Sequence, residues 1–335
     1  MENGDVIHIV LAFYDSKGLY ARYAGVVMVS IFENTKSMVC VHILHDETLT
    51  GQNRALLSET AEIYCQKAEF HDVSPLMDRV GDDALKLTKQ WSVGTLFRLF
   101  IPDLLPVGRI IYLDCDILVT LDIKELWDVP LGGRSLAGAV DCAVNDKLLS
   151  PQALRCRLLG CEWRSYINAG VLVMDLARIR GKHDLLHESA AWFERHGHNV
   201  ISVDQDFINS CFYKDIKIID EKYNSAQFSG DLSGRVLHAL INPKPWAGMV
   251  GTDLERIFWK TYLKTPWGRS APDVIDLMLD AVKTSPYMHR RTSRCYARIL
   301  SRFRNDIFRS TFPRIIRLFM NDLYHRIKRG FARRG

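Results

Sequence analysis

The sequence predicts an α/β fold in which a mostly parallel central sheet is covered by helices on both faces. Two observations favour this class. Short apolar segments alternate with longer segments of helical pattern along most of the chain, and no internal repeat is present. The chain also has 335 residues, 47% of them hydrophobic, which is enough for one large core. Alternating strands and helices of this kind are typical of parallel sheets with helices on each side.

The expected elements follow in order from the N-terminus. Apolar runs of five to eight residues are predicted to be strands, and longer segments with small or periodic apolar residues are predicted to be helices. The predicted strands are Val6–Phe13, Met38–Leu44, Ala68–Val73, Arg109–Leu113, Leu136–Val140 and Gly170–Met174. The predicted helices are Tyr20–Phe32, Thr50–Lys67, Ser92–Phe100, Arg178–His196 and Val203–Phe212.

Cysteine usage and hydropathy indicate a cytoplasmic protein. The eight cysteines are scattered, with no Cys-x-x-Cys and no zinc-type spacing to histidine, so reduced thiols are expected. The N-terminus is acidic, and the short apolar segment after it contains His8, which fits a strand better than a signal peptide. No uninterrupted apolar stretch reaches the roughly 18 residues of a spanning helix. We therefore expect a soluble or peripheral protein.

Charge is distributed unevenly along the chain. Residues 289–335 contain 14 Arg/Lys and 2 Asp, a net charge of +12, whereas residues 1–288 contain 30 basic and 37 acidic residues, a net charge of −7. In the basic segment Ile299, Phe303 and Ile307 share one helical face, and arginines lie opposite. Such helices suit the surface of an anionic membrane. Packing on the main domain and nucleic-acid binding are the alternatives.

Two carboxylates stand at the end of a predicted strand. Asp114 and Asp116 flank Cys115 directly after the apolar run Arg109–Leu113. If the chain stays extended for three residues, both side chains lie on the same face. Two carboxylates at the carboxyl end of a buried strand can hold Mn²⁺ or Mg²⁺ against a diphosphate. A solvated turn is the alternative for this pattern taken alone.

Three further polar clusters follow along the chain. The tripeptide Asn168–Gly170 precedes a strand, and its glycine permits close approach of the backbone to a ligand. Asp204 and Gln205 begin a predicted helix, where they face a reacting sugar or simply favour the helix N-terminus. His238 and Lys244 offer an imidazole for a metal ion and a cation for phosphate. The sequence contains no glycine-rich dinucleotide motif and no Walker loop.

Taken in order, these motifs resemble glycosyltransferase family 8, a family of retaining enzymes with the GT-A fold that includes bacterial lipopolysaccharide galactosyl- and glucosyltransferases. The resemblance covers roughly residues 6–268. It implies a GT-A catalytic domain at residues 1–268, and the charge and helical pattern described above then predict a basic amphipathic tail at residues 269–335. The motifs that carry it are Tyr-Leu-Asp-Cys-Asp (112–116), Asn-Ala-Gly-Val-Leu (168–172), Asp-Gln-Asp-Phe-Ile-Asn (204–209), His238 with Lys-Pro-Trp (244–246), and the closing segment Trp259–Trp267.

Carried over residue by residue, the resemblance assigns a role to each motif. Asp114, Asp116 and His238 are expected to hold Mn²⁺, with Mg²⁺ as the second choice, on the diphosphate of a UDP-sugar. Lys244 is expected to contact the phosphates. The remaining assignments are Ala12, Tyr14 and Asp15 to the uracil and ribose, Arg98 to the donor, Asn168, Ala169 and Gly170 to the donor sugar, and Asp141, Asp204 and Gln205 to the catalytic positions around sugar and acceptor.

The resemblance implies a UDP-sugar-dependent hexosyltransferase that forms an α-linkage. It would move galactose or glucose to a lipopolysaccharide core or related envelope glycan, at the inner face of the cytoplasmic membrane and without a nucleic-acid partner. Retention of the anomeric configuration follows either from double displacement with Gln205 as nucleophile or from attack on the same face of the sugar as the departing UDP. We favour the same-face route, because an amide oxygen is a poor nucleophile.

Two other classes of function fit part of the pattern. A metal-dependent nucleotidyltransferase or phosphodiesterase would also use Asp114 and Asp116, but it would not need Asn168 or Gln205. A non-catalytic module that binds nucleotide sugars, or nucleic acid through the tail, is the second alternative. Turnover of a UDP-sugar distinguishes the enzyme from such a module.

Overall fold

A computed structural model describes residues 6–88, 92–144, 151–240, 244–247 and 252–269. The chain divides into two compact units, one formed by residues 1–225 and 234–238 and the other by residues 226–233 and 239–335. The central sheet lies in the first unit. Residues 270–335 are outside the described part, so the predictions made for the basic tail and for a boundary at residue 268 stay predictions.

The centre of the first unit is a mixed sheet. Its strands are β1 (Ile7–Ala12), β2 (Val39–His45), β3 (Lys67–Asp72), β4 (Arg109–Leu113), β6 (Leu136–Ala139), β7 (Val171–Asp175) and β8 (Ile216–Ile219). Among the described residues their order is β3-β2-β1-β4-β7-β6-β8, and β7 alone runs against its neighbours. Two short strands, β5 (Ile117–Val119) and β9 (Val236–His238), form a separate antiparallel pair. The predicted mostly parallel sheet is confirmed.

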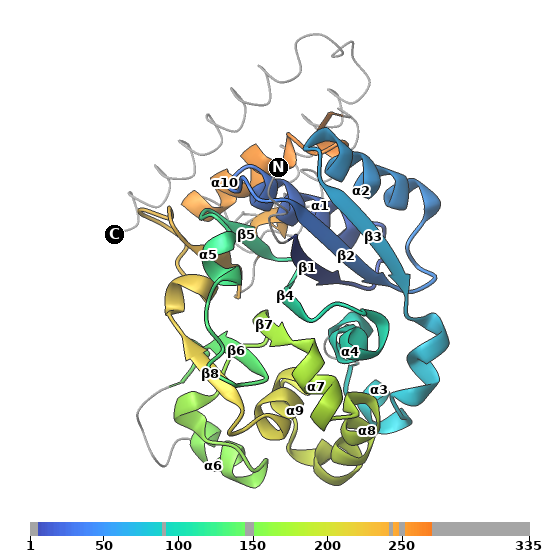
Figure 1. Ribbon diagram of the computed structural model, residues 1–335, viewed down its shortest axis with the longest axis vertical. Helices are drawn as coiled ribbons and strands as arrows, with labels where there is room; N and C mark the ends of the chain where they lie inside the picture. Colours follow the sequence, from blue (N-terminus) through green and yellow to red (C-terminus); the bar gives the residue numbers. More distant parts are fainter. Residues whose placement is uncertain (1–5, 89–91, 145–150, 241–243, 248–251, 270–335) are drawn as a thin grey trace, which may run out of the picture. The chain divides into compact units, whose positions relative to one another are not determined.

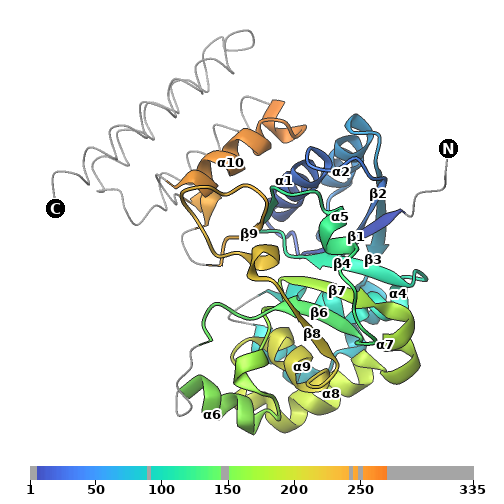
Figure 2. The same cartoon turned by 60° about the vertical axis from the view of Figure 1, so that its left-hand side comes forward.

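Helices cover both faces of this sheet. On one side lie α1 (Tyr20–Phe32) and α2 (Gly51–Ile63). On the other side lie α4 (Ile101–Leu104), α7 (Leu176–Lys182), α8 (Leu185–His196) and α9 (Val203–Cys211), as Figures 1 and 2 show. The first unit also contains α3 (Asp82–Leu87), α5 (Lys124–Trp127), α6 (Pro151–Leu158) and the 3₁₀ turns η1 (Ser74–Arg79), η3 (Val93–Phe100), η4 (Trp163–Ser165), η5 (Gly197–Asn199) and η6 (Glu221–Asn224).

The core of the first unit follows from the alternation of side chains along the strands. Val10 of β1 and Tyr112 of β4 are buried in one cluster with Phe97 and Phe100 of η3 and with Phe207 of α9. Successive residues such as Ile9 and Leu11 are also fully buried, although they point to the opposite face. Strands buried on both faces explain why their sequences are continuous apolar runs.

Two predicted helices end differently from expectation. The predicted helix Thr50–Lys67 begins as expected, because the Thr50 hydroxyl accepts a hydrogen bond from the backbone N–H of Asn53. It ends at Ile63, however, and Cys65 has φ 54°, a left-handed conformation that stops a helix. Lys67 is therefore the first residue of β3.

The predicted helix Arg178–His196 is two helices, α7 and α8. His183 between them is extended, with φ −133° and ψ 138°. Asp184 then caps α8 by accepting a hydrogen bond from the backbone N–H of His187. The predicted helix Ser92–Phe100 is the 3₁₀ segment η3, and its Gly94 packs closely on the first strand's end, since an added Cβ would lie 2.8 Å from the backbone nitrogen of Tyr14.

The second unit contains α10 (Asp253–Tyr262) and the short turns η7 (Pro245–Ala247) and η8 (Trp267–Arg269). Thr252 caps α10 by accepting from the backbone N–H of Glu255. Aromatic rings of α10 contact one another, with the Phe258 and Trp259 ring centroids 5.3 Å apart. In neither unit does the described part of the chain contain a helix long and apolar enough to span a membrane.

Candidate active site

Asp114 and Asp116 lie in a turn that joins β4 to β5. The backbone N–H of Asp114 donates to the carbonyl of Gly170, and the N–H of Ile117 donates back to the carbonyl of Asp114. The chain therefore turns over residues 114–116, and the two carboxylates come together without the extended backbone that the sequence analysis considered. The reason is that β5 leaves the sheet to pair with β9, so the chain must bend directly after β4.

The pairing of β5 with β9 brings a histidine to this turn. His238 pairs with Ile117, and its Nε2 lies 3.0 Å from Oδ1 of Asp116 and 3.8 Å from Oδ2 of Asp114. Its Nδ1 lies 2.8 Å from the side-chain oxygen of Asn224, so Nδ1 carries the proton and Nε2 presents its lone pair. The structure thus brings together the three side chains that were predicted to hold a metal ion.

This cluster suits a hard divalent cation. One ligand atom from each of Asp114, Asp116 and His238 lies within 4.8 Å of the other two. In octahedral coordination at 2.0–2.1 Å, neighbouring ligand atoms are about 3 Å apart, and the Asp116–His238 distance matches that value. Two carboxylates and one imidazole form a ligand set appropriate to Mn²⁺ or Mg²⁺, whose other ligands are typically water or phosphate oxygens.

Gly170 makes the close approach of these groups possible. A Cβ added to this residue would lie 2.2 Å from Cε1 of His238 and 2.7 Å from Oδ2 of Asp114. Both distances are far below van der Waals contact, and His238 is only 3% exposed, so it has little room to move. A glycine is therefore required here for the histidine to stand beside Asp114.

Arg98 is buried beside the cluster and holds Asp114 in place. Its guanidinium donates to Oδ1 of Asp114 at 2.8 Å, to the carbonyl of Ala169, and pairs with Asp204 at 3.0 Å. The ring of Tyr112 lies 4.3 Å away, and its hydroxyl also donates to Oδ1 of Asp114. Burial opposes the charge of Arg98, but the two carboxylates raise its pKa above the usual value. Arg98 was assigned to the donor, and the structure commits its guanidinium to these protein acceptors.

Asp204 is the buried partner of Arg98. Its side chain stands at the start of α9 and is almost completely buried. Burial raises the pKa of Asp204 to about 6, even though Arg98 acts in the opposite direction. The Asp204 carboxylate pairs with Arg98, which also donates to Asp114, so Arg98 connects the two carboxylates.

Three polar residues predicted to lie around the sugar form one hydrogen-bonded network. Oδ2 of Asp141 accepts from the side-chain amides of Asn168, at 3.2 Å, and Gln205, at 3.0 Å. The amide oxygen of Gln205 in turn accepts from the backbone N–H of Ala169, at 3.0 Å. Asn168 also accepts from the N–H of Gly170, which joins this network to the backbone beside the aspartates.

Two residues at this site were not identified from the sequence. Asn224 donates to the side-chain oxygen of Asn168 at 2.9 Å and accepts from His238, so it links the network to the candidate metal ligands. Tyr20 begins α1, and its partial burial together with the nearby Cys115, Asp116 and Asp114 raises its pKa to about 12. A single asparagine or tyrosine that belongs to no recognisable motif cannot be identified as a site residue from one sequence.

The residues assigned to uracil and ribose lie at the end of β1. Ala12 is its last residue, and Tyr14 is half-buried. Asp15 is 2% exposed, and its carboxylate accepts from the N–H groups of Tyr20 and Ala21 and from Asn53. Asp15 thus stabilises the start of α1, a structural task that the sequence did not reveal.

Lys244 belongs to the second unit. There its Nζ donates to the backbone carbonyl of Ala239. Its predicted contact with phosphate therefore stays a proposal.

Most of the sequence matches a known family. Residues 11–244 match the domain described as Glycosyl transferase family 8, which is more than half of the chain. The chain belongs to glycosyl transferase family 8. The identification made from the ordered motifs is thus confirmed, and the clustered aspartates, histidine and amides all lie inside the matched region, which ends at Lys244.

Relatives of this family member include proteins of several organisms. A putative glycosyltransferase of Haemophilus influenzae is 26% identical over 220 residues, which cover 65% of this chain and 64% of the relative. General stress protein A of Bacillus subtilis is 25% identical over 235 residues, or 68% and 77% of the two chains. A probable UDP-glucose:glycoprotein glucosyltransferase A of Dictyostelium discoideum is 30% identical over 216 residues, 62% of this chain and 12% of that protein.

Solved structures of glycosyltransferases share the fold. Galactosyltransferase LgtC, solved with donor and acceptor sugar analogues, has a TM-score of 0.65 at 24% identity, and the match covers 78% of this family 8 chain and 96% of LgtC. The bifunctional glycosyltransferase WbbM has a TM-score of 0.63 at 19% identity, covering 83% and 52%. Together with the mostly parallel sheet, these likenesses confirm the expected GT-A fold.

Proposed function

We propose that this glycosyltransferase moves galactose or glucose, with retention, from a UDP-sugar to a lipopolysaccharide core or related envelope glycan in a Mn²⁺-dependent reaction. The observation that carries the proposal is the convergence of Asp114, Asp116 and His238 beside the amide network of Asn168 and Gln205. The names of the relatives support the choice of donor, since one is a UDP-glucose-dependent glucosyltransferase and a structural neighbour is a galactosyltransferase.

The chain's own residues divide the work of binding and positioning. Asp114, Asp116 and His238 would hold the cation, which supplies positive charge to the departing diphosphate when bound. Arg98 fixes Oδ1 of Asp114 and leaves Oδ2 directed toward His238. Lys244 would add a second positive charge for the phosphates. Orientation of donor and acceptor lowers the entropic part of the barrier.

The network around Gln205 favours the same-face route. Its amide oxygen, the only candidate nucleophile on this side chain, already accepts a hydrogen bond from the N–H of Ala169. That bond draws electron density from an already weak nucleophile. We therefore assign Gln205 to the stabilisation of positive charge at the sugar's anomeric carbon, while a UDP oxygen takes the acceptor's proton. Asp204 was expected to share this role with Gln205, but it pairs with Arg98, so we assign that part to Asp141, which accepts from Gln205.

The test is a screen of UDP-sugars with the full-length protein. In the absence of acceptor, we expect slow hydrolysis of UDP-galactose or UDP-glucose that requires Mn²⁺ and stops with EDTA, with free UDP as the nucleotide product. Release of pyrophosphate or cleavage of a phosphodiester would instead identify a nucleotidyltransferase or phosphodiesterase. Binding of UDP-sugars without any turnover, even with candidate acceptors, would identify a binding module.

Replacing Gln205 with alanine should impair turnover more than donor binding. The side chain contacts Asp141 and Ala169 and belongs to the sugar part of the proposed site, beyond the diphosphate. We expect kcat to fall at least about tenfold more than the affinity for UDP, measured by initial rates and by calorimetry. Gln52→Ala, an exposed glutamine of α2, is the matched control. Full turnover with lost UDP affinity would remove Gln205 from the catalytic assignment.

We also propose that residues 289–335, which lie outside the described residues, hold the enzyme on the inner face of the cytoplasmic membrane. Fourteen Arg/Lys against two Asp, beside apolar faces of helical spacing, support this proposal. Each basic side chain near an anionic leaflet contributes about 1 kcal/mol. A protein that ends at Arg291 should therefore keep UDP-sugar hydrolysis but no longer sediment with anionic vesicles. Loss of folding on truncation, or vesicle binding by the full chain that ignores lipid charge, would contradict the proposal.

A further inference from the structure

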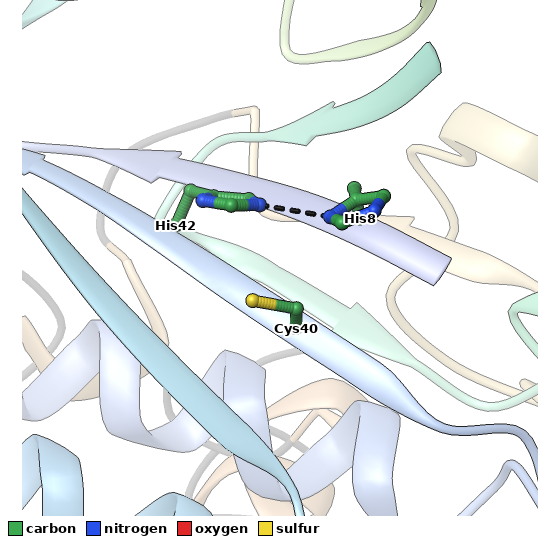
Figure 3. Close-up of side chains that lie close together, drawn as sticks. All are labelled: His8, Cys40 and His42. Carbon is green, nitrogen blue, oxygen red and sulfur yellow. Dashed lines mark hydrogen bonds between the residues drawn. The ribbon is translucent and has the colours of Figure 1, made fainter. Parts of the chain in front are cut away.

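Three histidines stand side by side on the face of the sheet formed by β1, β2 and β3. Nδ1 of His8 lies 2.9 Å from Nε2 of His42, the contact drawn in Figure 3. Nδ1 of His42 lies 3.1 Å from Nε2 of His71 and 3.3 Å from Oε2 of Glu69. The register explains this meeting, because His42 pairs with Glu69 and His71 pairs with Leu44, two residues along β2.

This face of the edge strand is reached from solvent. The guanidinium of Arg54 in α2 lies 4.5 Å from the ring centroid of Phe70, which places α2 on the Phe70 face of β3. Glu69 and His71 point to the opposite face, since side chains alternate along a strand. Glu69 is 35% exposed and His71 is half-buried, whereas His42 is 3% exposed. The buried imidazole of His42 thus lies next to two side chains, those of Glu69 and His71, that solvent reaches.

We propose that His42, Glu69 and His71 form a second metal site, suited to Zn²⁺, in which His42 ligates through Nδ1, Glu69 through Oε2 and His71 through Nε2. At the usual Zn–N and Zn–O distances of 2.0–2.2 Å, tetrahedral ligands are about 3.3 Å apart. The distances from Nδ1 of His42 to His71 and Glu69, 3.1 Å and 3.3 Å, fit that spacing. Water would occupy the fourth position, on the exposed side.

The surroundings of these ligands are those of a metal site. The second nitrogen of His42, Nε2, faces Nδ1 of His8, which can accept its proton and fix the tautomer that ligates. The other oxygen of Glu69, Oε1, pairs with Lys67 and leaves Oε2 for the metal. Imidazole nitrogen is a borderline donor and carboxylate oxygen a hard one, so a set of two neutral imidazoles and one carboxylate suits zinc better than Mn²⁺ or Mg²⁺.

A neighbouring ligand set, His8, Cys40 and His42, is less suitable. It has the buried thiol of Cys40 in place of the carboxylate of Glu69, and a thiol must lose its proton before it can bind an ion. Cys40 is 4% exposed, so an ion would have no entry path from the sulfur side, whereas Glu69 opens to solvent. A bound ion at the chosen set would join β2 to the edge strand β3. Because it would bind the folded state, it would also stabilise the sheet edge.

The experiment measures Zn²⁺ binding by the full-length protein that carries Asp116→Asn, a change that disables the other metal site. We expect about one Zn²⁺ per chain by equilibrium dialysis and a higher melting temperature with Zn²⁺ than with EDTA. Glu69→Gln keeps the size of the side chain, and His71→Ala removes a ligand. Each should weaken Zn²⁺ binding at least about 100-fold, since loss of even an outer partner costs about 10–100-fold.

Matched controls are available in another cluster of the same unit. His183, which lies between α7 and α8, and Glu188 of α8 lie beside Cys211. The changes His183→Ala and Glu188→Gln have the same chemistry at a different place. These variants should bind Zn²⁺ as tightly as their parent. The proposal is overturned if the parent binds no Zn²⁺, if Glu69→Gln and His71→Ala bind it undiminished, or if the control changes remove the binding instead. None of these readouts depends on sugar transfer.

Discussion

Replacing Asp116 with asparagine is expected to lower sugar transfer at least about a hundredfold at ordinary Mn²⁺ concentrations. The change keeps the shape of the side chain but removes one of two negative charges within reach of the cation, and Oδ1 of Asp116 is 3.0 Å from Nε2 of His238. The affinity for UDP in the presence of Mn²⁺ should fall as well. Initial rates across a Mn²⁺ titration and calorimetry with UDP measure both effects.

The control for this change is Asp128→Asn. Asp128 follows α5, is exposed, and pairs with Lys124 on the surface. Exposed pairs of this kind contribute about 0–1 kcal/mol, so the control should transfer sugar at the normal rate. Near-normal transfer by Asp116→Asn in the presence of EDTA would refute the metal assignment.

The second large effect is expected from Gly170→Ala, which adds a single methyl group. That methyl would overlap Cε1 of His238 and Oδ2 of Asp114, at 2.2 Å and 2.7 Å. Overpacking at a buried position costs about 1–3 kcal/mol of unfolding free energy. Relief of the overlap must move either candidate metal ligand, so metal-dependent UDP binding should fall at least about tenfold even in protein that stays folded.

Gly181→Ala is the matched control for that change. Gly181 lies in α7, and an added Cβ there would meet nothing within 4 Å. Alanine is the better helix former by about 0.5–1 kcal/mol, so the control should be as stable as the parent or more stable. Denaturant unfolding and UDP calorimetry compare the two variants. If Gly170→Ala matches the parent protein in UDP affinity and stability, then the position of His238 does not require a glycine at residue 170.

Much of the fold could be predicted because its strands are strongly marked in the sequence. Arg109–Leu113 is a strand with the predicted bounds, and Tyr20–Phe32 is a helix with the predicted bounds. Both are apolar segments that an acidic residue follows directly, Asp114 and Glu33 respectively. The polar motifs also identified the family, because they occur along the chain in the family's order. Together they gave the positions of Asp114, Asp116 and His238, which the structure brings together.

Other features depend on contacts between distant parts of the chain. The turn at Asp114 arises because β5 pairs with β9, and pairing between distant segments has no local signal. Arg98 and Asp204 were assigned to the donor and the sugar by their motifs, yet they pair with each other. The break at His183 depends on the cap supplied by Asp184, a residue that also occurs inside helices. Asn224 acts through two hydrogen bonds that only the folded chain forms.

The position of His238 on the last strand of the first unit determines when the site is complete during synthesis. A nascent chain that has emerged through β7 already carries both aspartates and Arg98, but it lacks the imidazole and the whole of β9. Pairing of β9 with β5 must close a long loop, so it forms late in folding. If the three side chains hold the cation as we propose, only chains whose translation has passed residue 238 bind it tightly, and shorter ribosome-bound fragments should not compete for the donor.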